Sequence, residues 1–371
     1  MPTTRPILHL LPSEPFGGLQ SIVIDLAQAQ QAAGKAVKIL LLGDSPRVVA
    51  RCRAAGIEPI VLAGGKLARM VALRRRLSEF RDAIVHSHCE PIWAVPILAA
   101  RPSSWVVHLH VYANRAARYW SGHAIRRHFA RRFIAITHSI GESFSDNNLV
   151  PTRRLGMVYN GLDFANFPEP ATTRNDPFTV AFVGRAVREK GLFDFIEVAD
   201  LLRDVPGLRF VIAGEGGGLS DARRLITQKG LDDRITVLGF VEDMQDVWRS
   251  SDLLLMLSEL EPFGLVTIEA IASGVAVLGY DTQSGGSEVM ANLPGCDMVK
   301  PFDIAALAQG VLKAVADKDL RRVVQFGRVI AMRRFSMTRM EEEVAAEYEL
   351  AGLKTTNAVV RNSPESIAEL S

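Results

Sequence analysis

The strongest constraint on the fold is an alternation of short apolar runs with longer amphipathic segments, which repeats along most of the chain. Short apolar runs are typical of strands buried in a parallel sheet, and amphipathic runs are typical of the helices that cover it. In the first half the predicted strands are Ile7–Leu11, Val37–Leu42, Pro59–Leu62, Ala83–Ser87, Trp105–His110, Phe133–Thr137 and Met157–Tyr159. The helices predicted between them are Ser21–Ala33, Arg47–Ala55, Leu67–Phe80, Ile92–Ala100 and Ile140–Asn148. This pattern predicts an α/β, doubly wound domain.

The alternation stops at residues 166–177 (NFPEPATTRNDP), which hold three prolines and few apolar residues and therefore indicate a linker. It then restarts with predicted strands at Phe178–Val183, Arg209–Ala213, Ile235–Leu238, Leu253–Leu257 and Val275–Gly279. Helices are expected to begin near Glu189, Ser220, Asp243, Gly264 and Ser287. We expect two tandem Rossmann-like domains, 1–168 and 177–335, which face a central cleft at the carboxyl ends of their strands.

The C-terminal end is predicted to differ from this alternation. Met337–Leu350 has the pattern of a helix, and we expect residues 336–353 to cross back toward the N-terminal domain. Residues 354–371 are polar and are expected to form a flexible tail.

Composition excludes several classes of protein. No apolar run reaches the roughly 18–20 residues of a membrane span. The three cysteines, Cys52, Cys89 and Cys296, are odd in number and contain no CxxC pair, so neither a disulfide framework nor a cysteine zinc site is expected. This cysteine usage favours a reducing, cytoplasmic location. The net charge of +2 and the absence of a nucleic-acid motif argue against nucleic acid as a partner.

Charge is divided unevenly between the two halves. Residues 1–170 hold 21 Lys and Arg against 11 Asp and Glu, whereas residues 171–371 hold 22 against 30. Six arginines of the basic half are interleaved with Tyr119, Trp120, Ile125 and Phe129: Arg115, Arg118, Arg126, Arg127, Arg131 and Arg132. This stretch is either a solvated helix face or a surface for peripheral contact with anionic lipid headgroups.

Two cations flank the turn that follows a predicted strand, in FVGRAVREKG (182–191). Val183 ends the strand, Gly184 makes the turn, and Arg185 and Lys190 lie on either side of the next helix start. An arginine fork and a lysine point charge would converge on a diphosphate and neutralise it as a leaving group. The alternative is a pair of solvated side chains.

A second candidate site is LSELEPFGLVTIEA (257–270), which carries Glu261 and Glu269 around a predicted helix start. The backbone N–H groups of Gly264, Leu265 and Val266 would point out of that start, which suits a phosphate. Glu269 lies farther into the helix, where it could accept hydrogen bonds from ribose hydroxyls. Acidic residues near helix starts are also common because of the helix dipole.

Two glycine-rich turns are expected to line the cleft. Gly17 and Gly18 precede a helix and would let the backbone approach a phosphate from the N-terminal domain. Gly214 belongs to IAGEGGG (212–218), where Leu219 replaces the third glycine of GxGxxG, so we interpret this segment as a tight turn. The sequence contains no GxxxxGK[ST] phosphate loop.

Four histidines occur in two pairs, VHSH (His86 and His88) and VHLH (His108 and His110). Within each strand both histidines face the same side. If the two strands are neighbours, the histidines could bind a metal, although no carboxylate or cysteine ligands are evident nearby beyond Cys89 and Glu90. The alternatives are that His110 polarises a hydroxyl in an acceptor pocket, or that the histidines are buried and hydrogen-bonded.

These motifs together resemble the GT-B glycosyltransferases, specifically the retaining group known as family 4, from about Ile7 to Phe335. The most specific parts are the E-x7-E motif from Glu261 to Glu269 and the segment VGRAVREKG (183–191). VYNGLD (158–163), LGFVEDMQDVWRSSDLLL (238–255) and the opening GGLQSIVIDLAQAQQAAGKAV (17–37) are also similar to segments of the family. The sequence departs from the family at Leu257-Ser258, Ala276 and Gly34-Lys35, which affects the loops and not the charged contacts.

The resemblance implies a role for each matching residue. Arg185 and Lys190 would hold the diphosphate, Glu269 the ribose and Glu261 the donor sugar. Further donor contacts would come from Gly17, Gly18, Gly184, Gly214, Phe263, Gly264, Leu265 and Val266, and from main chain at Phe240 and Val241 that frames the base. The acceptor would lie against His88, His110 and Tyr112, and the groups that act in catalysis would be His110, Glu261, Arg185 and Lys190.

The expected activity is transfer of a sugar, with retention, from a UDP- or GDP-linked donor to a hydroxyl of a glycan or lipid-linked acceptor. Neither a metal nor another cofactor is expected, and the expected setting is the synthesis of bacterial cell-surface polysaccharide or lipopolysaccharide. Two alternatives stay open: a UDP-sugar 2-epimerase on the same fold, and a non-catalytic nucleotide-sugar-binding protein.

Overall fold

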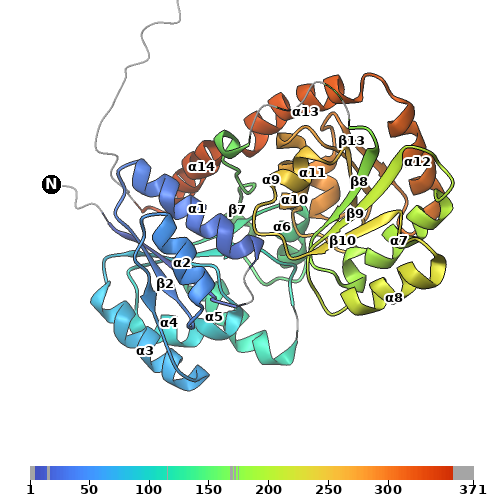
Figure 1. Cartoon of the computed structure of the whole chain (residues 1–371). Coiled ribbons are helices and arrows are strands. Elements are labelled where there is room, and N and C mark those ends of the chain that lie inside the picture. Colours follow the sequence, from blue (N-terminus) through green and yellow to red (C-terminus); the bar gives the residue numbers. More distant parts are fainter. Residues whose placement is uncertain are drawn as a thin grey trace, which may run out of the picture.

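Two parallel sheets form the framework of the protein (Figure 1). The structure, a computed structural model, describes residues 5–14, 17–114, 116–167, 170, 173 and 175–353. Within these residues the first sheet has seven strands in the order β3-β2-β1-β4-β5-β6-β7, and the second has six in the order β10-β9-β8-β11-β12-β13. In both sheets the strand order reverses beside the first strand, β1 or β8, as in Rossmann-like folds. The fold class predicted from the sequence is confirmed.

The N-terminal domain contains the first sheet and the helices that connect its strands. The strands are β1 (Ile7–Leu11), β2 (Val37–Leu41), β3 (Ile60–Val61), β4 (Ile84–Ser87), β5 (Ser104–Leu109), β6 (Arg132–Ala135) and β7 (Leu155–Met157). The helices are α1 (Gly18–Ala32), α2 (Pro46–Ala54), α3 (Lys66–Glu79), α4 (Ala94–Ala100), α5 (Trp120–Phe129) and α6 (His138–Ser145). Short 3-10 turns lie at η1 (Pro91–Trp93), η2 (Ala117–Tyr119), η3 (Thr152–Arg154) and η4 (Phe164–Asn166).

The C-terminal domain repeats this arrangement. Its strands are β8 (Phe178–Val183), β9 (Leu208–Ala213), β10 (Ile235–Gly239), β11 (Leu253–Met256), β12 (Ala276–Tyr280) and β13 (Cys296–Val299). Its helices are α7 (Leu192–Leu201), α8 (Leu219–Lys229), α9 (Gln245–Arg249), α10 (Leu265–Ala272), α11 (Gly285–Met290), α12 (Ile304–Ala316) and α13 (Leu320–Phe335). A 3-10 turn, η5 (Arg188–Lys190), leads from β8 to α7.

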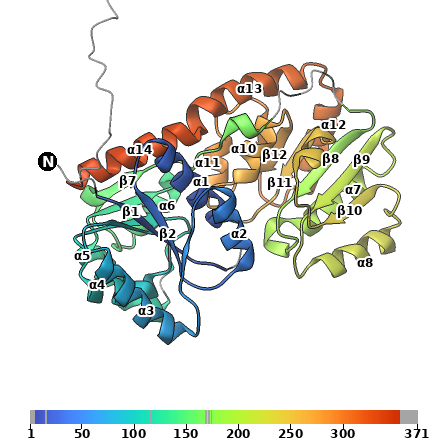
Figure 2. The same ribbon diagram turned by 60° about the vertical axis from the view of Figure 1, so that its left-hand side comes forward.

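The last helix, α14 (Met337–Leu350), leaves the C-terminal domain and packs on the N-terminal one. Figure 2 shows α13 and α14 running one after the other along the top of both domains. Four residues of α14 enter the core beside β1 and β2: Met337, Met340, Val344 and Tyr348. Ion pairs join Lys35 to Glu341 and Arg132 to Glu347. The crossing predicted for the C-terminal helix is confirmed, and the unusual Lys35 has a structural partner.

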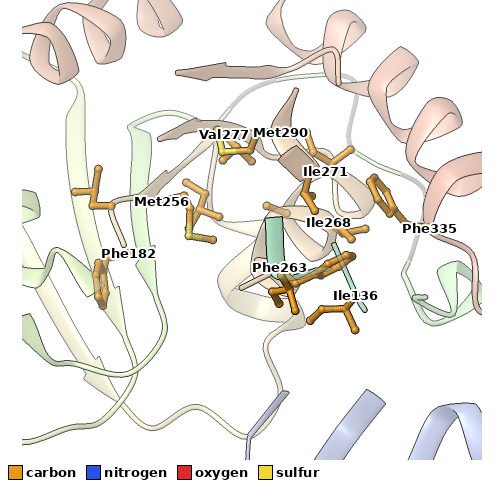
Figure 3. Close-up of a cluster of buried hydrophobic side chains, with 14 of the residues drawn as sticks. Ile136, Phe182, Met256, Phe263, Ile268, Ile271, Val277, Met290 and Phe335 are labelled. Carbon is orange, nitrogen blue, oxygen red and sulfur yellow. The ribbon is translucent and has the colours of Figure 1, made fainter. Parts of the chain in front are cut away.

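The two domains also share apolar contacts beneath the cleft. Ile136, which follows β6, lies near Phe263 of the C-terminal domain, and Phe263 in turn packs edge-on against Phe335 of its own domain with ring centroids 6.0 Å apart (Figure 3). Phe263 is almost fully buried, which corresponds to about 1.5–3 kcal/mol of hydrophobic stabilisation. The contact therefore restrains the relative position of the domains.

Some sequence predictions differ from the structure. β7 begins two residues earlier than predicted. Four elements of the structure were not among the predicted strands and helices: α5, β13, α12 and α13. The edge strand β13 is only partly buried and contains an exposed Asp297, so it lacks the apolar run by which the other strands were recognised. The tail prediction for residues 354–371 lies outside the described residues, and the exact domain boundaries stay predictions. Among the described helices, none is both long and apolar enough to cross a membrane.

Candidate functional site

A cavity of about 370 Å³ lies between the domains, where the carboxyl ends of both sheets meet. Eleven of the residues predicted from the sequence line it: Gly17, Gly18, His110, Gly184, Arg185, Lys190, Glu261, Phe263, Gly264, Leu265 and Val266. In open α/β sheets this edge is where ligands bind, because the loops that follow the strands converge there.

The two predicted cations enter the cavity from the loop after β8. Lys190 donates to Oε2 of Glu261 at 2.6 Å, whereas the Arg185 side chain is exposed and has no partner within the described residues. Gly191 fixes this loop, because its φ of 75° is left-handed and a Cβ there would collide with Leu257. The sequence thus places one paired and one unpaired cation at the mouth of the same cavity.

Glu261 is held in place before it meets any ligand. Besides Lys190, the hydroxyl of Ser258 donates to its Oε2 at 3.0 Å. The main-chain N–H of Gly286 donates to its carbonyl oxygen at 2.9 Å. Its carboxylate is therefore oriented at the cavity wall by groups from separate segments.

The start of α10 forms the opposite wall. Gly264 is its N-terminal capping residue and has a left-handed φ of 85°. Within the described residues no side chain caps the helix start, so the first N–H groups of α10 are available to a ligand. Gly18 approaches from the N-terminal domain, where an added Cβ would lie 2.9 Å from the Leu265 side chain. A larger residue at position 18 would therefore collide with the first residue of α10.

Glu269 lies farther along α10 and does not line the cavity. Burial, together with the nearby carboxylate of Asp25, raises the pKa of Glu269 to about 7. Asp25 belongs to α1 of the N-terminal domain and is held by Arg51. The sequence analysis missed Asp25, because one aspartate in an amphipathic helix carries no recognisable signal. The carboxylate of Asp25, in the N-terminal domain, therefore lies near enough to influence the ionisation of Glu269 in the C-terminal domain.

The segment predicted to frame the base lies beside the cavity and not in its lining. Phe240 follows β10 and is half exposed, with the guanidinium of Arg47 4.5 Å from its ring centre. Gly214 donates from its main-chain N–H to the carbonyl of Gly239 at 2.7 Å, and neither Gly214 nor Val241 touches the cavity. Arg47 comes from α2, so the two domains meet at this segment as well.

Tyr112 and Glu288 join the domains at another point. The Tyr112 hydroxyl lies 3.0 Å from Ser139 Oγ and accepts from the Gly285 N–H at 2.8 Å. Glu288 accepts from the main-chain N–H groups of His138 and Ser139 at 2.9 and 3.2 Å. Burial would raise the pKa of Glu288, but these hydrogen bonds hold it below its usual value. The predicted acceptor role of Tyr112 stays a prediction, since its hydroxyl is already used between the domains.

The predicted histidine pairs do lie on neighbouring strands, β4 and β5, and a fifth histidine joins them from β1. His9 was missed because only the pairing of β1 with β4 brings it beside His86. Two groups have candidate ligand atoms within 4.8 Å of one another, one formed by His9, His86 and His88 and the other by His88, His108 and His110. Burial lowers the pKa of every member, so all five are neutral at neutral pH. Of the cluster, only His110 lines the cavity.

Part of the basic stretch is used inside the protein. Arg126 is buried and donates to the carbonyl of Cys89, and Arg132 pairs with Glu347. Arg118 and Arg131 are exposed, as is Trp120 with 74% of its surface accessible. Arg115 lies outside the described residues. Arg126 and Arg132 therefore belong neither to a solvated helix face nor to a lipid-contact surface, the two alternatives given for this stretch, because their side chains are used inside the protein.

Two family models match consecutive parts of the chain. Residues 16–166 match Glycosyltransferase Family 4, and residues 163–326 match Glycosyl transferases group 1. One relative, the α-D-kanosaminyltransferase of Streptomyces kanamyceticus, is 24% identical over 324 residues, which cover 78% of this chain and 83% of the relative. The glycogen synthase of Mycobacterium tuberculosis is 27% identical over 258 residues, with 64% of this chain and 61% of the relative covered. The chain spans only 18% of another relative, an exopolysaccharide phosphotransferase of Streptomyces coelicolor, at 31% identity over 171 residues.

Solved structures share the fold. HepE from Anabaena, in complex with UDP and glucose, aligns with a TM-score of 0.80 at 20% identity and covers 94% of this chain and 100% of its own. The apo form of the lipopolysaccharide outer core galactosyltransferase WaaB aligns with a TM-score of 0.71 at 15% identity, covering 92% and 99%. With its two Rossmann-like sheets and the two family matches, the chain belongs to the GT-B glycosyltransferases.

Proposed function

We propose that the protein transfers a sugar from a nucleoside-diphosphate sugar to a hydroxyl of a glycan or lipid-linked acceptor, with retention at the anomeric carbon. The observation that carries the proposal is the convergence of Arg185, Lys190 and the uncapped start of α10 on one cavity. Positive charge and free N–H groups at one point suit a diphosphate, both in the bound donor and as it departs.

The other parts of the site fit the remaining groups of such a donor. Glu269, whose pKa is raised by burial and by the nearby Asp25, would accept hydrogen bonds from the ribose hydroxyls, and Glu261, which is paired with Lys190, would lie where the sugar joins the diphosphate. Glu261 is already bound to Lys190 and Ser258, so we assign it to orienting the sugar and not to nucleophilic attack. HepE binds UDP, which favours a UDP-linked donor here as well, with GDP as the second choice.

Leaving-group stabilisation in this proposal comes from the protein alone, without a metal ion. Arg185, Lys190 and the α10 amides provide the charge that a divalent cation supplies in other transferases. The setting that we propose is the synthesis of bacterial cell-surface polysaccharide or lipopolysaccharide, at the cytoplasmic membrane face.

Nucleotide binding can be tested by thermal unfolding. We expect UDP to raise the melting temperature more than GDP, ADP or TDP. The effect should be large enough to measure, because a ligand at 100 times its Kd adds about 2.7 kcal/mol of stability. The shift should persist in EDTA and should be reduced in Arg185→Ala. Arg322→Ala, which removes an exposed arginine of α13, serves as the matched control and should keep the full shift. Absence of a shift with all four nucleotides would contradict the donor assignment, and loss of the shift in EDTA would contradict metal independence.

Peripheral membrane binding is a separate part of the proposal. The N-terminal half carries the excess of cations, and the exposed Trp120 lies close in sequence to the exposed Arg118. We expect the protein to sediment with vesicles that contain phosphatidylglycerol and not with pure phosphatidylcholine, and binding should weaken with salt. Trp120→Ala should reduce binding, whereas Leu312→Ala, an exposed apolar residue of α12, should not. Equal binding to both kinds of vesicle, or to neither, would refute this part.

A further inference from the structure

A buried chain of side chains connects His110 at the cavity to the C-terminal helix. His110 Nε2 lies 2.9 Å from His88 Nδ1, and His88 Nε2 lies 2.9 Å from His9 Nδ1. His9 Nε2 lies 2.8 Å from Gln30 Oε1 on α1. The amide of Gln30 donates to the Tyr348 hydroxyl at 3.5 Å, and that hydroxyl lies 2.7 Å from His86 Nδ1. This chain of hydrogen bonds therefore runs from the cavity, past strands β5, β4 and β1, to α14.

Each link of this chain restricts the next one. A neutral imidazole has one N–H donor and one bare acceptor nitrogen, so successive rings must all donate in the same direction. A protonated ring would place two donors against each other. Burial lowers the pKa of His9 to about 4 and that of His110 to about 3, and it also lowers that of His88, which keeps the chain neutral.

The Gln30 amide selects the direction. Its carbonyl oxygen, which can only accept, lies 2.8 Å from His9 Nε2, so His9 donates from Nε2. Its NH2 group donates to the Tyr348 oxygen, which leaves the Tyr348 O–H to donate to His86 Nδ1. His9, His88 and His110 consequently all carry their proton on Nε2. Nδ1 of His110 is left bare, with no hydrogen-bond partner within the described part of the chain.

We infer that Gln30 and Tyr348, acting through His9 and His88, hold His110 in the tautomer whose Nδ1 accepts a hydrogen bond from a substrate hydroxyl. This inference rests on the proposed function, since it names what His110 recognises in the transferase cavity. Gln30, His9 and His88 are then positioning residues, and His110 orients a hydroxyl without keeping its proton. In the opposite tautomer His110 would present an N–H to the cavity and would repel the same hydroxyl hydrogen.

A metal ion on the same histidines is the competing explanation. His88 and His110 belong to one of the groups of possible ligands, and His108, beside them, has two buried ring nitrogens without a partner in the described residues. Coordination by His88 Nδ1 and His110 Nε2 would require a lone pair on both atoms. At 2.9 Å these two atoms instead share one proton, so the geometry favours the hydrogen-bonded chain.

The first test is the tautomer itself, measured by ¹⁵N NMR on the full-length protein labelled at histidine and free of substrate. The His110 signals are assigned by their loss in His110→Ala. We expect the pattern of an Nε2–H imidazole at His110, retained in Gln30→Glu, whose carboxylate still accepts from His9. Gln30→Leu removes that acceptor, and His110 should become a mixture of tautomers. An Nδ1–H signal at His110 in the wild type, or stoichiometric zinc in the purified protein, would overturn the inference.

The second test separates positioning from structural damage by a double-mutant cycle. Gln30→Leu should lower kcat about tenfold with little change in the KM for the donor. In a His110→Ala background the same substitution should cause no further loss, because its effect acts through His110. Gln31→Leu, the adjacent exposed position on α1, is the matched control and should leave kcat unchanged. Additive losses would refute the coupling.

The two tests also separate this inference from the proposed function. The NMR measurement needs neither donor nor acceptor, so it decides the tautomer even if no transfer is detected. If Gln30→Leu does not fold, the wild-type spectrum still decides. Conversely, an Nδ1–H tautomer at His110 in a protein that binds UDP would refute only the role of Gln30, His9 and His88 in holding His110, and not the proposed function.

Discussion

Replacing Lys190 with alanine is expected to lower kcat/KM by about 10²–10³, because the departing diphosphate loses its paired cation. The ammonium lies 2.6 Å from Glu261 in the wall of the cavity that we propose holds the diphosphate. A charged contact to a developing negative charge contributes about 2.7–4 kcal/mol in a site from which water is excluded. Initial rates of sugar transfer, measured over a range of donor concentrations, test this expectation.

A second substitution, at Glu261, tests how Lys190→Ala weakens donor binding and turnover. In Lys190→Ala the carboxylate of Glu261 keeps Ser258 as its partner but loses its countercharge, so it also repels the diphosphate. Adding Glu261→Gln to Lys190→Ala should therefore restore part of the donor affinity while kcat stays low. Lys318→Ala removes an exposed lysine between α12 and α13 and should behave as the wild type. Turnover of Lys190→Ala within about threefold of the wild type would refute the diphosphate clamp.

The sequence predicts the central strands well because they are buried on both faces. β1 and β8 are apolar except for His9 and Thr179, and their predicted bounds are those of the structure. The part of the site that we propose binds the diphosphate could also be predicted, since Arg185, Lys190, Glu261 and the start of α10 lie in the loops that follow β8 and β11. A residue's distance from a strand end in the sequence then indicates its distance from the cleft.

Features that depend on how the strands are ordered in the sheet could not be predicted from the sequence. His9 and His86 are far apart in the chain, and only the adjacency of β1 and β4 makes them neighbours. Asp25 was missed because nothing marks one aspartate in an amphipathic helix, and its effect on Glu269 depends on how the two domains pack. Arg126 is the converse case. Its charge predicted a surface position, but the guanidinium is buried and donates a hydrogen bond to the carbonyl of Cys89.

The buried histidines also predict that the protein unfolds at mildly acidic pH. Burial lowers the pKa of five histidines: His9, His86, His88, His108 and His110. Each is neutral in the folded protein and takes up a proton on unfolding. Their contribution to the free energy of unfolding is thus present above the ordinary histidine pKa of about 6.5 and is lost below it. The loss continues down to the folded pKa, which is about 4 for His9 and about 3 for His110.

Two carboxyl groups oppose this effect. The pKa of Glu269 is raised to about 7 and that of Asp25 is also raised, both mainly by burial, so the folded protein binds these protons before the unfolded chain does. Five histidines outnumber the two carboxyls, so unfolding takes up protons below about pH 6, and each such proton corresponds to about 1.4 kcal/mol of stability lost per pH unit. A domain protein has only about 5–15 kcal/mol in total. We therefore expect most of the stability to disappear between about pH 6.5 and pH 4.5.

Urea unfolding followed by circular dichroism at pH 7.5, 6.5, 5.5 and 5.0 measures this slope, and His108 offers a variant that changes it alone. Neither ring nitrogen of His108 has a partner within the described residues, so His108→Leu removes a buried proton-binding group without breaking a hydrogen bond. The variant should be at least as stable as the wild type at pH 7.5 and should lose about 1.4 kcal/mol less per pH unit below pH 6. The exposed His128 on α5 provides the control, since His128→Leu should leave the slope unchanged. Stability that stays constant from pH 7.5 to pH 5.0 would mean that the histidines are not buried in the neutral form.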